Sequence, residues 1–355
     1  MTRSVIIGSG SYIPDVNIIN ASFNDNIFFE KDGTKLTRSN ESVIEKFSEI
    51  TGIIERKYAR PDQQASDLGY LSAEDAINSS GIDRETLDYI IVAHNFGDVT
   101  YEGNRSSLVP SLASRIKALL KIKNPDCVAY DLPFGCPGWI EGVIQANAFI
   151  KAGDAKRCLV IGTETLSRVI DPHDRDSMIY SDGSGAVIIE AHNSDKGIIA
   201  CKTQTHAVDL SMLLHMGSSY SPGTEMKNDL YIKMNGRKVY EFALNFVPLV
   251  IKNVLDKTGT DITEIKKVLV HQANDKMDAA ILERLFKLYG HDSIPEGIMP
   301  MTISWLGNSS VATVPTLLDL ILKGNLPDHT LLPGDKVIMA SVGAGMNINA
   351  LLYQF

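Results

Sequence analysis

The chain lacks the features that would place it in several common classes of protein. No stretch of about 18 residues is uninterruptedly apolar, which argues against a membrane span. The N-terminal Met-Thr-Arg-Ser-Val-Ile-Ile-Gly leads directly into a strand pattern and has no long apolar stretch typical of a signal peptide. A formal net charge of −9 disfavours nucleic acid as a general partner. We therefore expect a cytoplasmic protein that binds neither a membrane nor nucleic acid.

Cysteine is scarce as well, since the 355 residues include only four, at positions 127, 136, 158 and 201. No two of them have the Cys-x-x-Cys spacing that is typical of zinc sites, and nothing indicates a disulfide framework. We expect reduced thiols and no metal site.

Stretches with the pattern of buried strands alternate with helical stretches, which predicts an α/β fold. The expected strands are 5–10, 89–93, 127–131, 158–162, 185–190, 268–271 and 337–342. The expected helices are 65–80, 107–121, 140–152, 239–258 and 275–289. A turn signal in Asn193-Ser-Asp-Lys-Gly197 divides the chain near residue 195, into halves 1–195 and 196–355.

Cys136 lies in the run Asp131-Leu-Pro-Phe-Gly-Cys-Pro-Gly-Trp139, directly before the helical stretch 140–152. Pro137 suits the first position of a helix, because its missing N–H costs nothing there. The thiol would then lie at a helix N-terminus, where free N–H groups and the helix dipole favour a thiolate. Cys136 is therefore a candidate nucleophile, and a buried structural cysteine is the alternative.

A histidine and an asparagine occupy two notable positions in the second half. His271 ends the strand pattern that starts at Lys266, and Asn274 is placed to cap the next helix. Asn308 lies in a Gly-Asn-Ser-Ser turn that runs into small residues. Alone, each is more simply interpreted as structural. A cysteine, a histidine and an asparagine in these contexts and this order are much more specific.

In these features the chain resembles the ketoacyl synthase III family of the thiolase superfamily, the enzymes that start fatty-acid chains. The resemblance covers nearly the whole chain. Besides the run around Cys136, the motifs that carry it are Gly8-Ser-Gly-Ser-Tyr-Ile-Pro14, Thr51-Gly-Ile53 with Arg56, Ile161-Gly-Thr-Glu-Thr-Leu-Ser-Arg168, Ser181-Asp-Gly-Ser-Gly-Ala186, Lys233-Met-Asn-Gly-Arg237, His271-Gln-Ala-Asn274, Gly307-Asn-Ser-Ser310 and Gly343-Ala-Gly345.

The resemblance implies a thiolase-like fold, in which two similar halves, each with a five-stranded mixed sheet, stack as helix, sheet, helix, sheet, helix. Cys136 would come from the first half, and His271 and Asn308 from the second. The family forms dimers, so a homodimer is expected.

The resemblance also implies a decarboxylating condensation. Cys136 takes an acyl primer from a thioester, and the backbone N–H groups of Cys136 and Ala344 hold the tetrahedral oxyanion. A malonyl group on acyl carrier protein then loses carbon dioxide. His271 and Asn308 hold the resulting enolate, which attacks the stored acyl group. No metal or redox cofactor is required.

Related enzymes differ at these positions. Chain-elongating ketoacyl synthases have a second histidine where this chain has Asn308. Thiolases use a second cysteine near the C-terminus, but no cysteine follows Cys201. Two alternatives stay open, namely acyl transfer without decarboxylation and condensation in a specialised lipid or polyketide pathway.

Three departures from the family pattern concern the substrates. Lys46 and Ile50 replace a tryptophan and an arginine that clamp the adenine of coenzyme A, although Arg175 matches another nucleotide-contacting arginine. Val109 replaces a phenylalanine that closes the acyl pocket across the dimer interface, so we expect medium or branched primers. Leu108 could instead fill that gap.

Carrier docking is expected at Arg237 and Lys276, near the phosphopantetheine entrance of the family. The longer polar segment 23–40 either covers part of the entrance or is a surface excursion, and the second interpretation is simpler.

Overall fold

Two β-sheets, one from each side of residue 195, set the architecture of the protein. The computed structural model describes residues 2–223 and 229–355. The first sheet has the strand order β1-β7-β6-β4-β5 and the second β11-β12-β13-β8. Their strands are β1 (Thr2–Tyr12), β4 (Tyr89–His94), β5 (Val128–Pro133), β6 (Arg157–Thr165), β7 (Asp182–Asn193), β8 (Gly197–Thr205), β11 (Ile265–Val270), β12 (Lys336–Gly343) and β13 (Asn347–Gln354).

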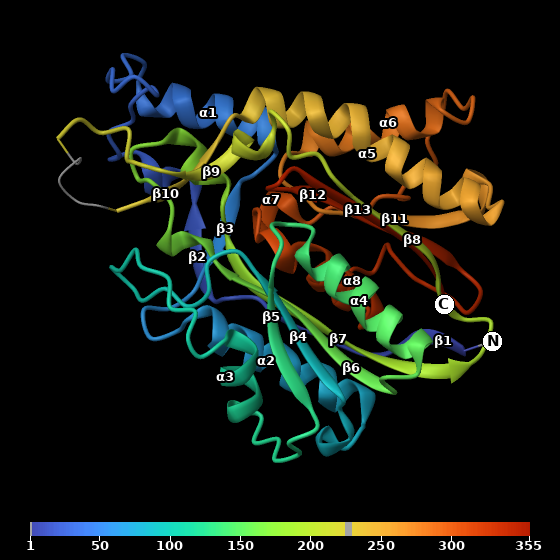
Figure 1. Cartoon of the computed structure of the whole chain (residues 1–355). Coiled ribbons are helices and arrows are strands. Elements are labelled where there is room, and N and C mark those ends of the chain that lie inside the picture. The colour runs from blue at the N-terminus through green and yellow to red at the C-terminus, as the bar shows by residue number, and fades with distance from the viewer. Residues whose placement is uncertain (1, 224–228) are drawn as a thin grey trace.

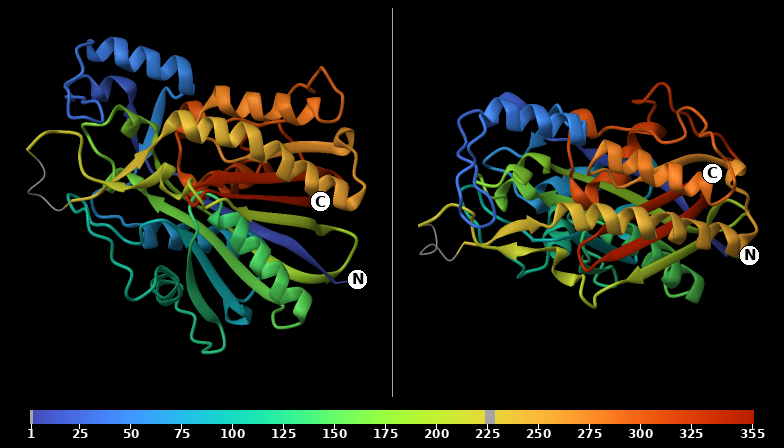
Figure 2. Two further views of the ribbon diagram at one scale, coloured as in Figure 1. Left: turned by 45° about the horizontal axis from the view of Figure 1, so that its top comes forward. Right: turned by 90° about the horizontal axis from the view of Figure 1, so that it is seen from above.

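Helices cover both sheets and also separate them, as Figure 1 shows. Helices α2 (Ala65–Ser80) and α3 (Leu112–Leu119) lie on the outer face of the first sheet, and α4 (Gly138–Ala152) and α8 (Thr313–Leu322) lie between the sheets. Helices α5 (Gly236–Thr258) and α6 (Asp275–Lys287) lie side by side on the outer face of the second sheet (Figure 2). The expected five layers are thus confirmed.

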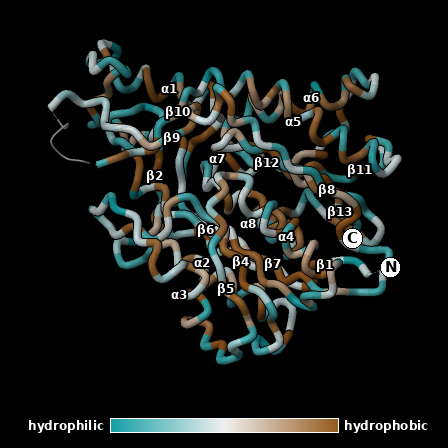
Figure 3. The backbone as a smooth tube through the Cα atoms, viewed as in Figure 1, coloured by the Kyte–Doolittle hydropathy of each residue, from teal (hydrophilic) through white to brown (hydrophobic). Residues whose placement is uncertain are grey.

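Burial on both faces explains why the central strands are almost continuously apolar. Ile90, Ile91 and Val92 of β4 are fully buried, although successive side chains point to opposite faces of the sheet. Figure 3 shows hydrophobic stretches concentrated along these strands. Strand β4 pairs in parallel with both β5 and β6, so their carboxyl ends share one edge. That edge leads into the loop that carries Cys136.

The predicted division near residue 195 lies in the connection between β7 and β8. Every described strand of the first sheet precedes it, and every described strand of the second follows it. That the two halves are duplicated domains stays a prediction.

The second sheet has four strands in the described residues, so the expectation of five was wrong. Residues 295–300 run beside β11 but form only part of a ladder, with the Val268 N–H donating to the Ile298 carbonyl at 2.8 Å. Pro295 and Pro300 lie at either end of this segment and have no N–H to donate, which limits strand pairing there.

The helix expected at 107–121 is also shorter than predicted, because α3 begins only at Leu112. The Ser107 backbone pairs with Asp98 in an isolated bridge instead. Ser111 then caps the helix, and its hydroxyl accepts from the Ser114 N–H at 3.1 Å.

Among the described residues, six further strands and α-helices belong neither to the two main sheets nor to the helices that cover them. They are β2 (Val16–Ile19), β3 (Glu55–Tyr58), α1 (Asn40–Thr51), β9 (Leu214–Gly217), β10 (Tyr231–Met234) and the short helix α7 (Ile303–Leu306). Across residues 2–223 and 229–355, none of the helices has the length and apolarity that crossing a bilayer requires.

One buried carboxyl group weakens the second half. Asp278 of α6 is fully buried, and neither side-chain oxygen has a hydrogen-bond partner of good geometry, although the Asn274 backbone lies near enough to lower its pKa slightly. Burial, with a smaller effect of Asp275, raises its pKa well above the usual value. Below the pKa of the unfolded chain both states are protonated. As the pH rises above it, the unfolded chain ionises while the folded one keeps its proton, so stability falls.

We therefore expect Asp278→Leu to increase the free energy of unfolding at pH 7 by about 1–3 kcal/mol, the usual cost of an unsatisfied buried polar group. The gain should be smaller at pH 4. Urea denaturation at both pH values measures it. A loss of stability at pH 7 would contradict this account of Asp278.

Candidate active site

The three residues predicted to carry the chemistry line one cavity. Its volume is about 1240 Å³, and its wall includes Cys136, His271 and Asn308. Cys136 lies in the loop between β5 and α4, His271 directly follows β11, and Asn308 comes shortly after α7. Each reaches the cavity from a different element, and the first half of the chain meets the second there.

The loop that carries Cys136 needs glycine at position 135. Gly135 has a φ of +72°, and a Cβ there would lie 3.1 Å from both the backbone nitrogen and the oxygen of Ala344. Helix α4 begins at Gly138, two residues before the expected stretch 140–152. Pro137, expected at the first helical position, is instead the N-cap, at a φ of −69°. Cys136 therefore precedes the helix N-terminus and faces the loop 343–345.

Backbone hydrogen bonds place His271 at the end of its strand. Its N–H donates to the Ala340 carbonyl of β12 at 2.9 Å. The buried side chain of Gln272 donates to the Pro300 carbonyl at 2.8 Å and accepts from the Thr302 N–H at 2.8 Å. Asn274 caps α6 as predicted, by accepting from the Met277 N–H. Hydrogen bonds thus hold the backbone from His271 to Asn274 in place.

Asn308 is held by its backbone and by its side-chain oxygen. Its N–H donates to Ile179 at 3.0 Å, and its carbonyl accepts from Ser181 at 2.8 Å. Its Oδ1 accepts from the Ser310 N–H at 2.8 Å. This bond fixes the orientation of the carboxamide and leaves the Nδ2 hydrogens to donate elsewhere.

Two residues that were not predicted complete the surroundings of the sulfur. The Ser310 hydroxyl donates to Cys136 Sγ at 3.2 Å, and the Asn95 side chain donates to Ser310 Oγ at 2.9 Å. Ser310 belongs to the Gly-Asn-Ser-Ser motif, so that motif already contained a signal for it. Asn95 merely follows a strand, and no pattern in the sequence marks it.

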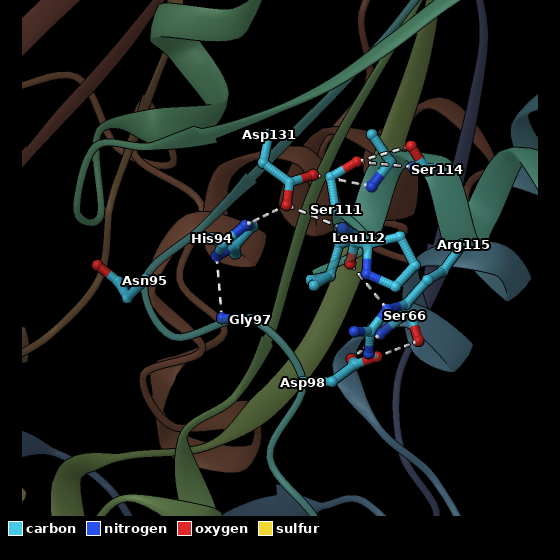
Figure 4. Close-up of polar contacts among 12 residues, drawn as sticks. Ser66, His94, Asn95, Gly97, Asp98, Ser111, Leu112, Ser114, Arg115 and Asp131 are labelled. Atoms are coloured by element: carbon cyan, nitrogen blue, oxygen red, sulfur yellow. Dashed lines mark hydrogen bonds and ion pairs between the residues drawn. The ribbon is translucent and has the colours of Figure 1, made fainter. Parts of the chain in front are cut away.

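The base of the Asn95 loop is held by a polar cluster shown in Figure 4. His94 Nε2 lies 3.1 Å from Asp131 Oδ2, and His94 Nδ1 accepts from the Gly97 N–H at 3.0 Å. Asp131 also accepts the Leu112 N–H at the start of α3. The Asn95 side chain points away from this cluster, and its backbone N–H donates to Glu164.

Burial decides the charges in the cavity. It raises the pKa of Cys136 to about 11, with Ser310 acting in the opposite direction and Glu164 in the same one. Loss of water around the sulfur thus opposes the effect expected of the helix N-terminus, although the side chain is only partly buried. That the helix N-terminus favours a thiolate stays a prediction. Burial lowers the pKa of His271 to about 4, against an opposing effect of the Ser310 backbone. It raises the pKa of Glu164 to about 7.

The backbone at 343–345 passes directly over the cysteine. A Cβ on Gly343 would lie 2.8 Å from the Cys136 nitrogen, so this position admits only glycine without displacement. Ala344 lines the cavity, and its carbonyl accepts from the Asn347 side chain at 2.8 Å. The segment 343–345, which contains the expected oxyanion donor Ala344, thus lies against the loop that carries Cys136.

The cavity opens between α1, the start of α5 and the segment 30–38. Residues Glu30, Lys35, Arg38, Lys46, Ile50, Arg175 and Arg237 contribute to this mouth. The segment 23–40 therefore borders the entrance, contrary to the simpler interpretation of a surface excursion. Arg175 forms an ion pair with Glu30 at 3.2 Å.

The other predicted binding residues are placed as follows. The Arg237 side chain is 89% exposed and pairs with Glu241 at 3.0 Å. Lys276 and Val109 lie outside the part of the cavity wall formed by described residues. Lys276 lies near Glu49 of α1, and Val109 is 89% exposed in this single chain. Within the described part of the chain, no three histidine, cysteine or acidic side chains are grouped as a metal site.

Because burial raises the pKa of Cys136 to about 11, its rate of alkylation should keep rising from pH 7 to pH 10. Iodoacetamide labelling, followed by mass analysis of the peptide that contains Cys136, measures this rate. The Cys136→Ala variant identifies signals from the other cysteines. A plateau in the alkylation rate below pH 9 would contradict the raised pKa of Cys136.

Comparison with known proteins agrees with this geometry. The family description 3-Oxoacyl-[acyl-carrier-protein (ACP)] synthase III matches residues 130–207, and its C-terminal counterpart matches residues 255–355. A beta-ketoacyl-[acyl-carrier-protein] synthase III from Sphingopyxis alaskensis is 30% identical, over 99% of this chain and 98% of that protein. A synthase III 1 from Vibrio vulnificus is 31% identical, over 99% of each chain.

A solved structure shows the same fold. The crystal structure of 3-oxoacyl-[acyl-carrier-protein] synthase III from Aquifex aeolicus superposes with a TM-score of 0.79 and 27% identity, over 99% of this chain and all of that one. Sequence and structure therefore agree over the full length, and the chain belongs to the beta-ketoacyl-[acyl-carrier-protein] synthase III family.

Proposed function

We propose that the protein is a 3-oxoacyl-[acyl-carrier-protein] synthase III. It joins an acyl primer held on Cys136 to malonyl-ACP with loss of carbon dioxide, in fatty-acid chain initiation. The observation that carries this proposal is the meeting of Cys136, His271 and Asn308 in one cavity. A thiol, an imidazole and a carboxamide suit acyl storage and enolate stabilisation.

In the first half-reaction, neutral His271 accepts the Cys136 proton as the sulfur attacks the thioester carbonyl. The backbone N–H groups of Cys136 and Ala344 hold the tetrahedral oxyanion. When this intermediate collapses, the carbon–sulfur bond to the carrier breaks and His271 returns the proton to the departing thiolate. Burial raises the pKa of the thiol, so the sulfur must lose its proton as it attacks, and the oriented donors around it offset part of that cost.

In the second half-reaction, the bond between the malonyl carboxylate and its α-carbon breaks, and carbon dioxide leaves. The electron pair stays as an enolate, whose oxygen is held by an imidazole N–H of His271 and by Asn308 Nδ2. The α-carbon then attacks the acyl group, the carbon–sulfur bond to Cys136 breaks, and the departing thiolate takes a proton from solvent water. A neutral histidine beside an amide presents no negative charge to the enolate.

The mouth of the cavity supports a second candidate, a synthase III-like acyltransferase or condensing enzyme of a specialised lipid or polyketide pathway. Lys46 and Ile50 offer neither a stacking surface nor a bidentate contact for an adenine. Arg175 is paired with Glu30. These features favour a carrier-bound donor over acyl-CoA, and Arg237 and Lys276 supply positive charge for an acidic carrier protein.

We also propose a cytoplasmic homodimer that needs no cofactor. The loop between β4 and α3 supports the dimer, because it exposes three apolar side chains, Tyr101 (52%), Leu108 (52%) and Val109 (89%). In a dimer, Val109 would face the partner's acyl pocket. Its small side chain leaves room for medium or branched primers, at roughly 0.8 kcal/mol per buried methylene.

The central test incubates the protein with malonyl-ACP and acyl donors of increasing length and branching. Wild type should form acyl-Cys136, release carbon dioxide and yield a 3-oxoacyl product, best with primers longer than acetyl. Cys136→Ala should form neither acyl-enzyme nor product. Asn308→Asp should keep acylation but lose condensation by about 100-fold or more, because a carboxylate repels the enolate. Mass spectrometry follows each species.

An acylated Cys136 without release of carbon dioxide would favour the second candidate. Strict preference for acetyl donors would contradict the assignment of Val109.

Glu30→Gln should free Arg175 and lower the KM for acyl-CoA by a factor of about two to five, since an exposed ion pair contributes at most about 1 kcal/mol. The KM for an acyl-carrier donor should change little. The matched control is Glu296→Gln, an exposed glutamate outside the mouth. Tight saturation of wild type by acetyl-CoA would contradict the predicted preference for a carrier-bound donor.

A further inference from the structure

A chain of hydrogen bonds leads from Asn95 through Ser310 to the sulfur of Cys136. Asn95 Nδ2 donates to Ser310 Oγ at 2.9 Å, and Ser310 Oγ donates to Cys136 Sγ at 3.2 Å. A hydroxyl has a single proton. Because Asn95 supplies the proton of the first bond, the proton of Ser310 is left for the sulfur. The chain therefore has a fixed direction that favours negative charge on Cys136.

The backbone of Ser310 is unusual as well. Its φ is +53°, one of four positive values among the described non-glycine residues. Such a conformation costs free energy and persists where the surroundings require it. Here it lets the Ser310 N–H donate to Asn308 Oδ1 at 2.8 Å while the hydroxyl donates to Cys136. Ser310 thus contacts both Cys136, which holds the acyl group in the proposed first half-reaction, and Asn308, which holds the enolate in the second.

Asn95 is held rigidly enough to direct the hydroxyl. It directly follows His94, the end of β4, which is fixed by Asp131 and by the Gly97 N–H (Figure 4). Its own backbone N–H donates to the buried carboxyl group of Glu164. The carboxamide of Asn95 is therefore presented to Ser310 by two neighbouring strands, β4 and β6.

We propose that Ser310 is a further catalytic residue, whose hydroxyl stabilises the Cys136 thiolate as the sulfur attacks. Asn95 is a positioning residue that acts through Ser310 by fixing the direction of its proton. In this role the serine offsets part of the cost of charging a partly buried sulfur as the thiol loses its proton. The proposal rests on the proposed role of Cys136 as the nucleophile.

The test measures the rate of Cys136 alkylation by iodoacetamide at pH 7.5, a reaction that needs no substrate. A hydrogen bond to a charged group and the free energy of one pKa unit predict that Ser310→Ala slows alkylation about 10- to 100-fold. Ser310→Gly should slow it equally, although glycine relieves the positive φ and should give the higher Tm of the two variants. Asn95→Ala should give a smaller loss in rate.

Ser309→Ala is the matched control, since its hydroxyl lies near Thr313 at 3.4 Å and not near the sulfur, and it should alkylate like wild type. Carbon dioxide release from a malonyl thioester should persist in Ser310→Gly, because the N–H that orients Asn308 remains. Wild-type rates in both Ser310 variants would overturn the proposal. Slow alkylation in Ser310→Ala but not in Ser310→Gly would also overturn the proposal, because the loss in rate would then come from backbone strain at position 310 and not from the missing hydroxyl.

A failure of the proposed function has a different signature. It would appear as absence of acyl-Cys136 in wild type with every donor, whatever the ratio of alkylation rates between the variants.

Discussion

The active site depends on the close approach of two backbone segments from opposite halves of the chain. Gly343, at the end of β12, lies so near the Cys136 loop that a single added carbon would come within 2.8 Å of the Cys136 nitrogen. Asn349 of β13 fastens the same loop by donating to the Pro137 carbonyl at 2.9 Å. Because the contact is between backbones, it fixes Cys136 relative to β12, which also holds His271 through Ala340.

Burial gives the cavity a common electrostatic character. The pKa of Cys136 is raised to about 11, that of His271 is lowered to about 4, and that of Glu164 is raised to about 7. The thiol and the imidazole are therefore both uncharged near neutrality. Such a site is suited to reactions in which charge appears only briefly, because its donors are already oriented.

Local patterns in the sequence predicted an α/β fold, α2 and the cap of α6 by Asn274. The resemblance to a family added the five-layer stacking and the meeting of Cys136, His271 and Asn308, which line one cavity. Local patterns could not predict that the described part of the second sheet has only four strands. The prolines at 295 and 300 limit pairing only because the fold places this segment beside β11, and that neighbour is not visible in the sequence. Local patterns also could not predict the contact of Ser310 with Cys136, which joins residues 174 positions apart. The pKa of Cys136 could not be predicted from the sequence for a related reason. The helix end is visible in the sequence, whereas burial is set by the assembled fold.

Both chain ends lie beside the connection between the two sheets (Figure 1). Thr2 pairs with Asn193, and Gln354 pairs with Gly197. The cavity is lined instead by residues of α1 and β9, two elements that lie at the other end of the molecule in Figure 1. An affinity tag or a surface linker attached at either terminus would thus point away from the opening, and the immobilised protein would remain accessible to bulky carriers.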